Sequence, residues 1–222
     1  MDAAPGLARA RLLAWLALLG VGLYVAIDIA LRFLHPAVNL LRDAESDYGN
    51  GPYSWLMDVN FEIRFLLSVA AAAAIWSAFR PRGGGRAGVI LLLIWAVGSA
   101  VLGFFRDDLP GAPLTRHGEL HLAAAAIAFV ACLLGTLLLL LDFRHHALMR
   151  PWGLLLVPVW VLGLLSLIAL LRAGFGPGSL GGLFERVFIG AQLAWFAIAS
   201  ARIVIARRAD AGIPGPPGMA RA

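Results

Sequence analysis

Six long apolar stretches constrain this chain more than any other feature of its sequence. Each has about 20 residues, the length that an α-helix needs to cross the hydrocarbon core of a bilayer. The chain is 61% hydrophobic and 14% charged, whereas soluble domains contain roughly 45–50% apolar and 25% charged residues. A soluble fold of this size cannot hide so much apolar surface. We therefore predict an all-α, six-transmembrane-helix bundle with helices near residues 12–34, 55–79, 87–106, 118–141, 152–172 and 183–206.

The placement of arginine predicts how this bundle is oriented, because cytoplasmic loops carry an excess of basic residues. With the N-terminus inside, the outer loops hold only Arg42 and Arg116. The inner segments hold Arg9, Arg11, Arg80, Arg82, Arg86, Arg144, Arg150, Arg207 and Arg208. We expect a cytoplasmic N-terminus (1–11), a transmembrane domain (12–206) and a disordered cytoplasmic tail (207–222), in a multi-pass protein of the plasma membrane. The basic charge then belongs to the loops, and we expect no nucleic-acid partner.

Apart from Arg202 near the cytoplasmic end of the last stretch, the charged residues in and beside the apolar stretches fall in the predicted outer halves of the helices. These residues are Asp28, Arg32, Asp58, Glu62, Arg64, Arg106, His117, Glu119, His121, Arg172, Glu185 and Arg186. Charge inside a membrane span is costly, and it often marks a functional site. The pattern predicts a polar pocket open to the outer face. The alternative is that each side chain merely extends to the interface.

Arg64 fits that alternative poorly because of its depth. It follows Trp55 by nine residues, which corresponds to roughly 13 Å along a helix. A guanidinium at this depth needs a carboxylate or a water-filled cavity. Asp108, Glu185 and Asp28 are the candidate partners.

Two pairs of side chains have the i, i+4 spacing that places residues on one helix face. Asp58 and Glu62 form one pair, and His117 and His121 form the other. Carboxylates facing histidines could hold a metal such as zinc, or could share protons in a network. In the loop between the first two helices, Ser46 and Asp47 could cap a short helix or line the pocket.

Four short segments, taken in order, resemble the domain of unknown function 998 family of membrane proteins. They are Ser46-Asp47-Tyr48-Gly49 with Gly51-Pro52-Tyr53, Gly103-Phe104-Phe105-Arg106-Asp107-Asp108-Leu109-Pro110-Gly111, Thr115-Arg116-His117-Gly118-Glu119-Leu120-His121, and Gly182-Leu183-Phe184-Glu185-Arg186-Val187-Phe188 followed by Trp195. The resemblance covers about residues 12–206 and implies no established biochemistry. Its pattern marks Ser46, Asp47, Asp108, His121, Glu185 and Arg186.

A looser similarity of site chemistry links the chain to the alkaline ceramidase and adiponectin-receptor group of membrane zinc hydrolases. Those proteins combine Ser, Asp and a histidine pair at i, i+4. This chain departs from them in having six predicted helices and in carrying its histidine pair on the fourth.

Three functions follow from these patterns as hypotheses. The first is a membrane-embedded hydrolase or lipid-modifying enzyme, with Asp108, His121, Glu185, Asp47 and Ser46 as catalytic candidates. Its ligand-binding candidates are Arg64, Arg186, Glu62 and Asp58, and its candidate zinc ligands are His117 and His121. The second is a protein that binds or transports a small polar ligand or a lipid headgroup. The third is a structural membrane subunit whose polar cluster only ties helices together.

Overall fold

The structure is a computed structural model that describes residues 3–109 and 111–206, and the regular secondary structure of this part of the chain is entirely helical. The six long helices are α1 (Ala3–Leu34), α2 (Ser54–Phe79), α3 (Gly84–Phe104), α4 (Arg116–Phe143), α5 (Gly153–Ala173) and α6 (Gly181–Ile205). Two short 3-10 helices lie between them, η1 (Glu45–Gly49) and η2 (Arg150–Trp152). All six long helices are long and apolar enough to cross a membrane. The predicted all-α class with six transmembrane helices is therefore confirmed.

The observed helix limits differ most from prediction at the N-terminus. The first helix begins at Ala3 rather than near residue 12, so the predicted N-terminal segment is largely a continuation of α1. The guanidinium of Arg11 donates a hydrogen bond to the carbonyl of Ala206, at the end of α6. Arg11 precedes the first predicted apolar stretch, so α1 contacts the end of α6 outside the segment that was predicted to span the bilayer. The predicted tail (207–222) lies outside the described residues.

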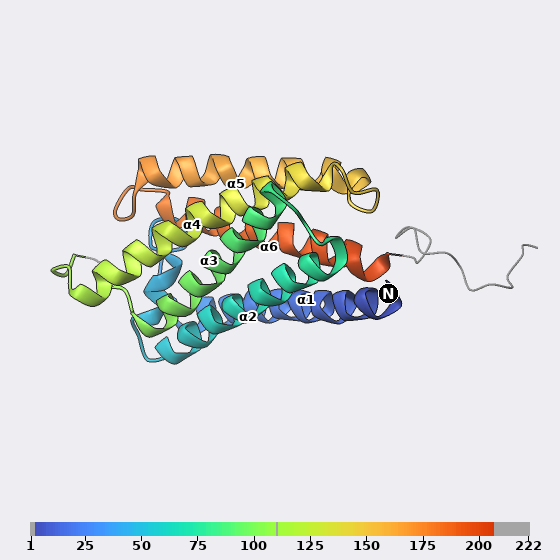
Figure 1. Ribbon diagram of the computed structural model, residues 1–222. Coiled ribbons are helices and arrows are strands. Elements are labelled where there is room, and N and C mark those ends of the chain that lie inside the picture. Colours follow the sequence, from blue (N-terminus) through green and yellow to red (C-terminus); the bar gives the residue numbers. More distant parts are fainter. Residues whose placement is uncertain (1–2, 110, 207–222) are drawn as a thin grey trace, which may run out of the picture.

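The helices run alternately up and down, so the described loops gather at two ends (Figure 1). We call the end that holds the N-terminus and the α2–α3 and α4–α5 connections the terminal end. The opposite end, with η1 and the connections after α3 and α5, is the far end. Helix α1 packs on α2 and α6, α3 packs between α2 and α4, and α5 packs on α6.

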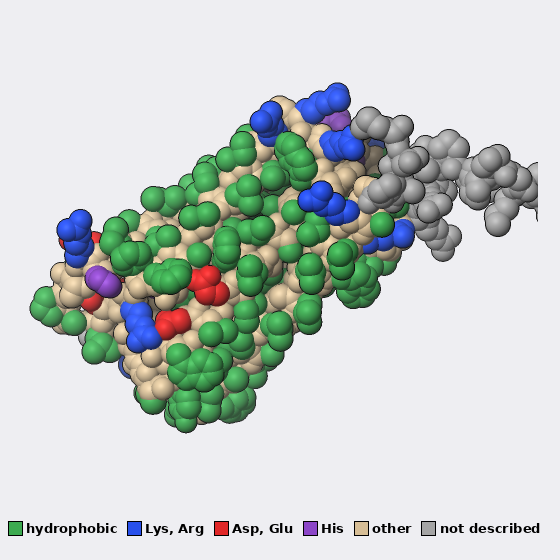
Figure 2. Space-filling view, turned by 60° about the horizontal axis from the view of Figure 1, so that its bottom comes forward, with side chains coloured by type: hydrophobic (Ala, Val, Ile, Leu, Met, Phe, Trp, Pro, Cys, Tyr) green, Lys and Arg blue, Asp and Glu red, His purple; other side chains and the backbone are tan. Residues whose placement is uncertain are grey.

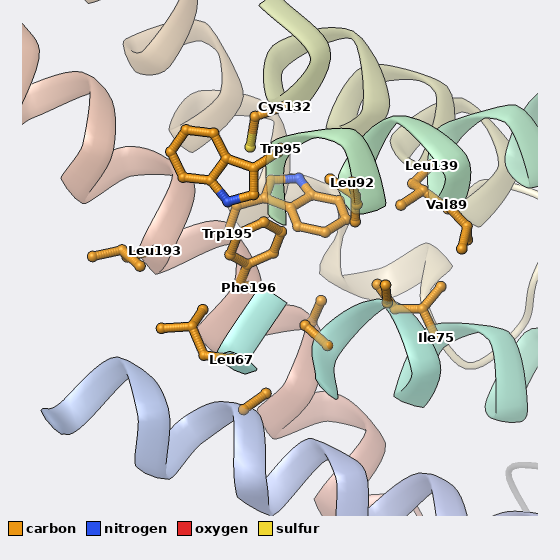
Figure 3. Close-up of a cluster of buried hydrophobic side chains, with 14 of the residues drawn as sticks. Leu67, Ile75, Val89, Leu92, Trp95, Cys132, Leu139, Leu193, Trp195 and Phe196 are labelled. Atoms are coloured by element: carbon orange, nitrogen blue, oxygen red, sulfur yellow. The ribbon is translucent and has the colours of Figure 1, made fainter. Parts of the chain in front are cut away.

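Helices α3 and α4 approach closely because small residues face each other. A Cβ atom added at Gly88 would lie 2.9 Å from the carbonyl oxygen of Gly135. Small residues allow this approach in membrane bundles, where helices associate through van der Waals packing. Beside this contact lies a core of large side chains, which includes Leu92, Trp95, Trp195 and Phe196 (Figure 3).

The surface of the molecule is apolar along its length. Figure 2 shows hydrophobic side chains over most of one face, with more basic side chains at the terminal end than at the far end, and acidic ones only towards the far end. Side chains such as Leu154 and Leu171 are 85% and 76% exposed, which favours contact with lipid rather than water. The chain is therefore an integral membrane protein.

Candidate functional site

The loop between α1 and α2 folds into the far end of the bundle and brings three polar residues with it. Glu45, Ser46 and Asp47, all in η1, are at most 8% exposed. Tyr24 of α1 donates a hydrogen bond of 2.5 Å from its hydroxyl to Glu45 Oε1. Glu45 in turn donates its backbone N–H to Glu185 Oε2 of α6 at 2.6 Å. These two bonds hold η1 between helices that are far apart in the sequence.

Arg64 of α2 lies at the centre of this polar region and is 1% exposed. Its Nε donates to Ser99 Oγ at 3.0 Å, and its Nη1 donates to the hydroxyl of Tyr24 at 3.3 Å. Its guanidinium carbon lies 4.8 Å from the ring centroid of Trp95 and 5.0 Å from that of Phe61. Such rings stabilise a desolvated cation.

The third nitrogen of this side chain has no such support. Arg64 Nη2 is buried without a hydrogen-bond partner. The ion pairs found among residues 3–109 and 111–206 do not include Arg64. The carboxylate partner that the sequence analysis considered is therefore replaced by a serine, a tyrosine and aromatic rings, and one donor is left over.

A cavity of about 380 Å³ lies beside Arg64. The polar side chains among its lining residues are Glu45, Ser46, Arg64, Asp107, His121 and Glu185. The rest of its lining is apolar, or glycine, and comes largely from α4 and α5. A mostly apolar pocket with a few convergent polar groups is the usual form of a small-molecule site.

Within the cavity, His121 and Asp107 form a potential proton-transfer pair. His121 Nε2 lies 4.0 Å from Asp107 Oδ2, and the same carboxylate oxygen accepts a hydrogen bond of 3.1 Å from Ser46 Oγ. His121 Nδ1 lies 2.6 Å from the carbonyl oxygen of Phe105. Because a carbonyl only accepts, Nδ1 carries the hydrogen. Nε2 of the neutral ring is then free to accept a proton.

Of the nine catalytic and ligand-binding candidates, the cavity lining includes Ser46, Arg64, His121 and Glu185. Asp47 is buried beside them in η1 but does not line the cavity. Burial, with added repulsion from Asp107 and Asp43, raises the pKa of Asp47 from its ordinary 3.8 to about 6. Asp47 is thus held in an environment that disfavours its charge.

The other four candidates lie outside the cavity lining. Asp58 forms an ion pair of 2.5 Å with Arg106, and Glu62 lies beside Gly103. Arg186 donates to the carbonyls of Leu40, Asp43 and Gly182, at 3.3, 2.8 and 3.1 Å, and so fastens the chain that leads into η1. Asp108 accepts from the backbone N–H and the hydroxyl of Thr115, at 2.6 and 2.8 Å, and these bonds lower its pKa.

The residues proposed for zinc do not form a ligand set in the structure. His117 is exposed and packs against the ring of Phe105, with 5.3 Å between ring centroids, whereas Nδ1 of His121 is occupied by the Phe105 carbonyl. In the described part of the chain, no group of three or more His, Cys, Asp and Glu side chains is arranged to hold a metal ion. The geometry therefore does not fit a zinc site at His117 and His121.

Three residues of this site were not selected from the sequence, namely Tyr24, Glu45 and Asp107. Tyr24 lies in an apolar stretch and reads as an ordinary aromatic. Glu45 is next to Ser46 and Asp107 is next to Asp108, and in each case only the neighbouring residue was selected from the sequence. The three-way contact of Ser46, Asp107 and His121 joins two loops and a helix, which no local spacing reveals.

The fold and site define a polytopic α-helical membrane protein with a partly polar cavity near one end of its helix bundle. Residues 18–202 match the model of a family described as "Protein of unknown function (DUF998)". The chain belongs to this family, which confirms the resemblance seen in its four motifs. A search of curated proteins and a search of solved structures each gave no match.

Proposed function

We propose that this protein is a membrane-embedded hydrolase or lipid-modifying enzyme whose chemistry takes place at the polar end of the cavity. The observation that carries the proposal is the meeting of His121, Asp107 and Arg64 in the lining of one largely apolar cavity. A proton acceptor and a cationic hydrogen-bond donor are the two parts that hydrolysis of an ester or amide needs.

In this reaction each group has a distinct role. His121 Nε2 takes a proton from water as the water oxygen attacks the carbonyl carbon of the substrate, and Asp107 stabilises the imidazolium that forms. Arg64 donates to the carbonyl oxygen as it becomes negative. The histidine then returns the proton to the leaving oxygen or nitrogen as the acyl bond breaks. Glu185 and Tyr24, through Glu45, keep η1 in place and so position Ser46.

The proposed orientation has the N-terminus in the cytoplasm and the far end outside the cell, in the plasma membrane. Support comes from the arginines at the terminal end, since basic loops are retained on the cytoplasmic side. The cavity would then lie in the outer half of the bilayer.

The test is product release from ester- and amide-linked lipids in proteoliposomes, followed by mass spectrometry. We expect His121→Ala and Asp107→Asn to lower turnover by about 10²–10⁴-fold, the usual worth of acid–base catalysis. Asp108→Asn is the matched control, because Asp108 is the adjacent carboxylate and contacts Thr115 instead of the cavity. Unchanged turnover in His121→Ala would overturn the proposal. Loss of turnover in Asp108→Asn alone would assign the catalytic role to Asp108, the carboxylate that the sequence pattern marks.

A second candidate, ligand binding without chemistry, is favoured by the unpartnered Arg64 Nη2. This reading covers both a binding protein and a transporter for a lipid headgroup or small polar ligand. It predicts saturable binding with no product in the same assay. A purely structural subunit predicts neither binding nor product.

A further inference from the structure

The opening of the cavity differs in chemistry from its interior. The lining residues that are also well exposed are apolar and come from α4, α5 and the turn after α5. On α4 they are Leu122, Ala126 and Val130, which are spaced four residues apart and so share one helix face. Beyond them, Leu171 and Phe175 are 76% and 48% exposed.

The polar lining residues lie deeper. Glu45, Ser46, Arg64, His121 and Glu185 are each at most 8% exposed, and the side chain of Asp107 is 16% exposed. A molecule that enters the cavity therefore passes apolar side chains before it reaches a charged group.

The arrangement of α4 and α5 explains where this opening lies. Figure 1 shows the two helices close together at the terminal end, where a short connection joins them, and spread apart towards the far end. The exposed lining residues of α4 and Leu171 of α5 belong to helices long and apolar enough to span the membrane. The opening is therefore formed mainly by helices that span the membrane, together with the turn after α5.

We propose that a neutral single-chain amphiphile enters this cavity from the bilayer, between α4 and α5, and binds with an ester or amide carbonyl on Arg64. The inference rests on the proposed function, since that carbonyl belongs to the bond that would be hydrolysed. It adds the substrate class and the route of entry.

The charges in the cavity support a neutral carbonyl compound rather than an anion. Arg64 Nη2 is a buried donor without an acceptor, and a carbonyl oxygen supplies one. The cavity also contains the carboxyl groups of Glu45, Asp107 and Glu185 against a single guanidinium. A fatty acid or phosphate headgroup would have to share the single guanidinium with these three acidic groups, and like charges repel strongly at short distance in a low-dielectric site.

The size of the cavity supports a single chain. A volume of about 380 Å³ is at the lower end of roughly 300–1,000 Å³ for small-molecule sites. It leaves room for one headgroup and the first part of one chain, and the remainder would extend between α4 and α5 into the lipid.

A pair of substitutions on α4 tests the route of entry. Ala126→Trp places an indole at the opening. Ala123→Trp is the matched control, because Ala123 is also exposed on α4 but does not line the cavity. As a second variant, Ala126→Cys is modified with a bulky maleimide after purification, so that folding precedes the block. The native Cys132 is 0% exposed and should stay unmodified.

The probes are a monoacylglycerol, the fatty acid with the same chain and a diacyl phospholipid, and binding is measured on purified protein in detergent. We expect the native protein and Ala123→Trp to bind the monoacylglycerol equally. Ala126→Trp and the modified Ala126→Cys should bind it about tenfold more weakly or worse, with unchanged melting temperatures. The fatty acid and the phospholipid should bind less well than the monoacylglycerol in every variant.

Two results would overturn the inference. Equal binding by Ala126→Trp, Ala123→Trp and the modified Ala126→Cys would place the entrance elsewhere, and tighter binding of the fatty acid would exclude a neutral ligand. Failure of the proposed function gives a different pattern, in which the monoacylglycerol binds as expected and no product forms. Hydrolysis of another lipid by a protein that does not bind the monoacylglycerol would retain the function and reject the substrate class.

Discussion

Arg64 illustrates how a single charged residue is accommodated within a membrane span. Desolvating a guanidinium is costly, and the usual remedy is a carboxylate partner. Here Ser99 and Tyr24 accept two hydrogen bonds, and the faces of Trp95 and Phe61 lie about 5 Å from the cation. This arrangement leaves Arg64 Nη2 without an acceptor at the edge of a cavity, where a ligand oxygen can supply one.

Asp47 gives a residue-scale prediction on pH. Its pKa rises from 3.8 to about 6 on folding because the carboxyl is buried near Asp107 and Asp43. Between about pH 4 and pH 6 the folded protein holds a proton that the unfolded chain has lost, so this contribution to stability declines as the pH rises. We expect the stability of the native protein relative to Asp47→Asn to decline across this interval. Titration of one proton can change the free energy of unfolding by at most about 1.4 kcal/mol per pH unit, and water near the site reduces this change.

The measurement for Asp47 is the melting temperature in detergent between about pH 4 and pH 7, compared between the native protein and Asp47→Asn. Asp108→Asn provides the contrast. Hydrogen bonds from Thr115 lower the pKa of Asp108, so its contribution is lost as the pH falls instead. Parallel pH profiles for the native protein and Asp47→Asn would contradict the raised pKa.

At the scale of elements, the contact of α3 with α4 depends on the absence of side chains. A methyl group added at Gly88 would meet the carbonyl oxygen of Gly135 and the side chain of Leu139, each at 2.9 Å. The backbone oxygen cannot move without shifting α4. We expect Gly88→Ala to destabilise the protein by about 1–3 kcal/mol, the typical cost of overpacking, as measured by thermal unfolding in detergent.

The matched control for Gly88 is Gly190→Ala on α6. No atom lies within 4 Å of a Cβ placed at Gly190, and alanine favours a helix over glycine by up to about 1 kcal/mol. This variant should therefore be as stable as the native protein or slightly more stable. Equal stability of Gly88→Ala and Gly190→Ala would show that α3 and α4 can separate at little cost.

At the scale of the whole molecule, the proposed orientation predicts which end of the bundle is reachable from outside the cell. Pro177 lies in the turn between α5 and α6 at the far end, and Arg82 lies between α2 and α3 at the terminal end. Both are exposed. In a Cys132→Ala background, we expect a membrane-impermeant maleimide to label Pro177→Cys in intact cells. Arg82→Cys should react only after the cells are permeabilised. The reverse labelling pattern would show that the protein has the opposite orientation in the membrane.

The sequence was sufficient for the features that depend on local composition. Each apolar stretch is long enough to span a bilayer by itself, so the six helices and their approximate limits follow from residue order alone. The depth of Arg64 and the presence of His121 and Glu185 near the predicted pocket also follow from helix geometry. The four DUF998 motifs were visible in the same way.

Only the tertiary structure decided which polar residues meet. Asp107 and Asp108 are adjacent, yet one lines the cavity and the other accepts from Thr115, because the direction of a side chain in a loop depends on distant packing. Glu45 reaches the site because η1 folds between Tyr24 and Glu185. The apolar opening likewise depends on the divergence of α4 and α5. Sequence determined the helices because a bilayer acts on each span separately, whereas the site depends on contacts between spans.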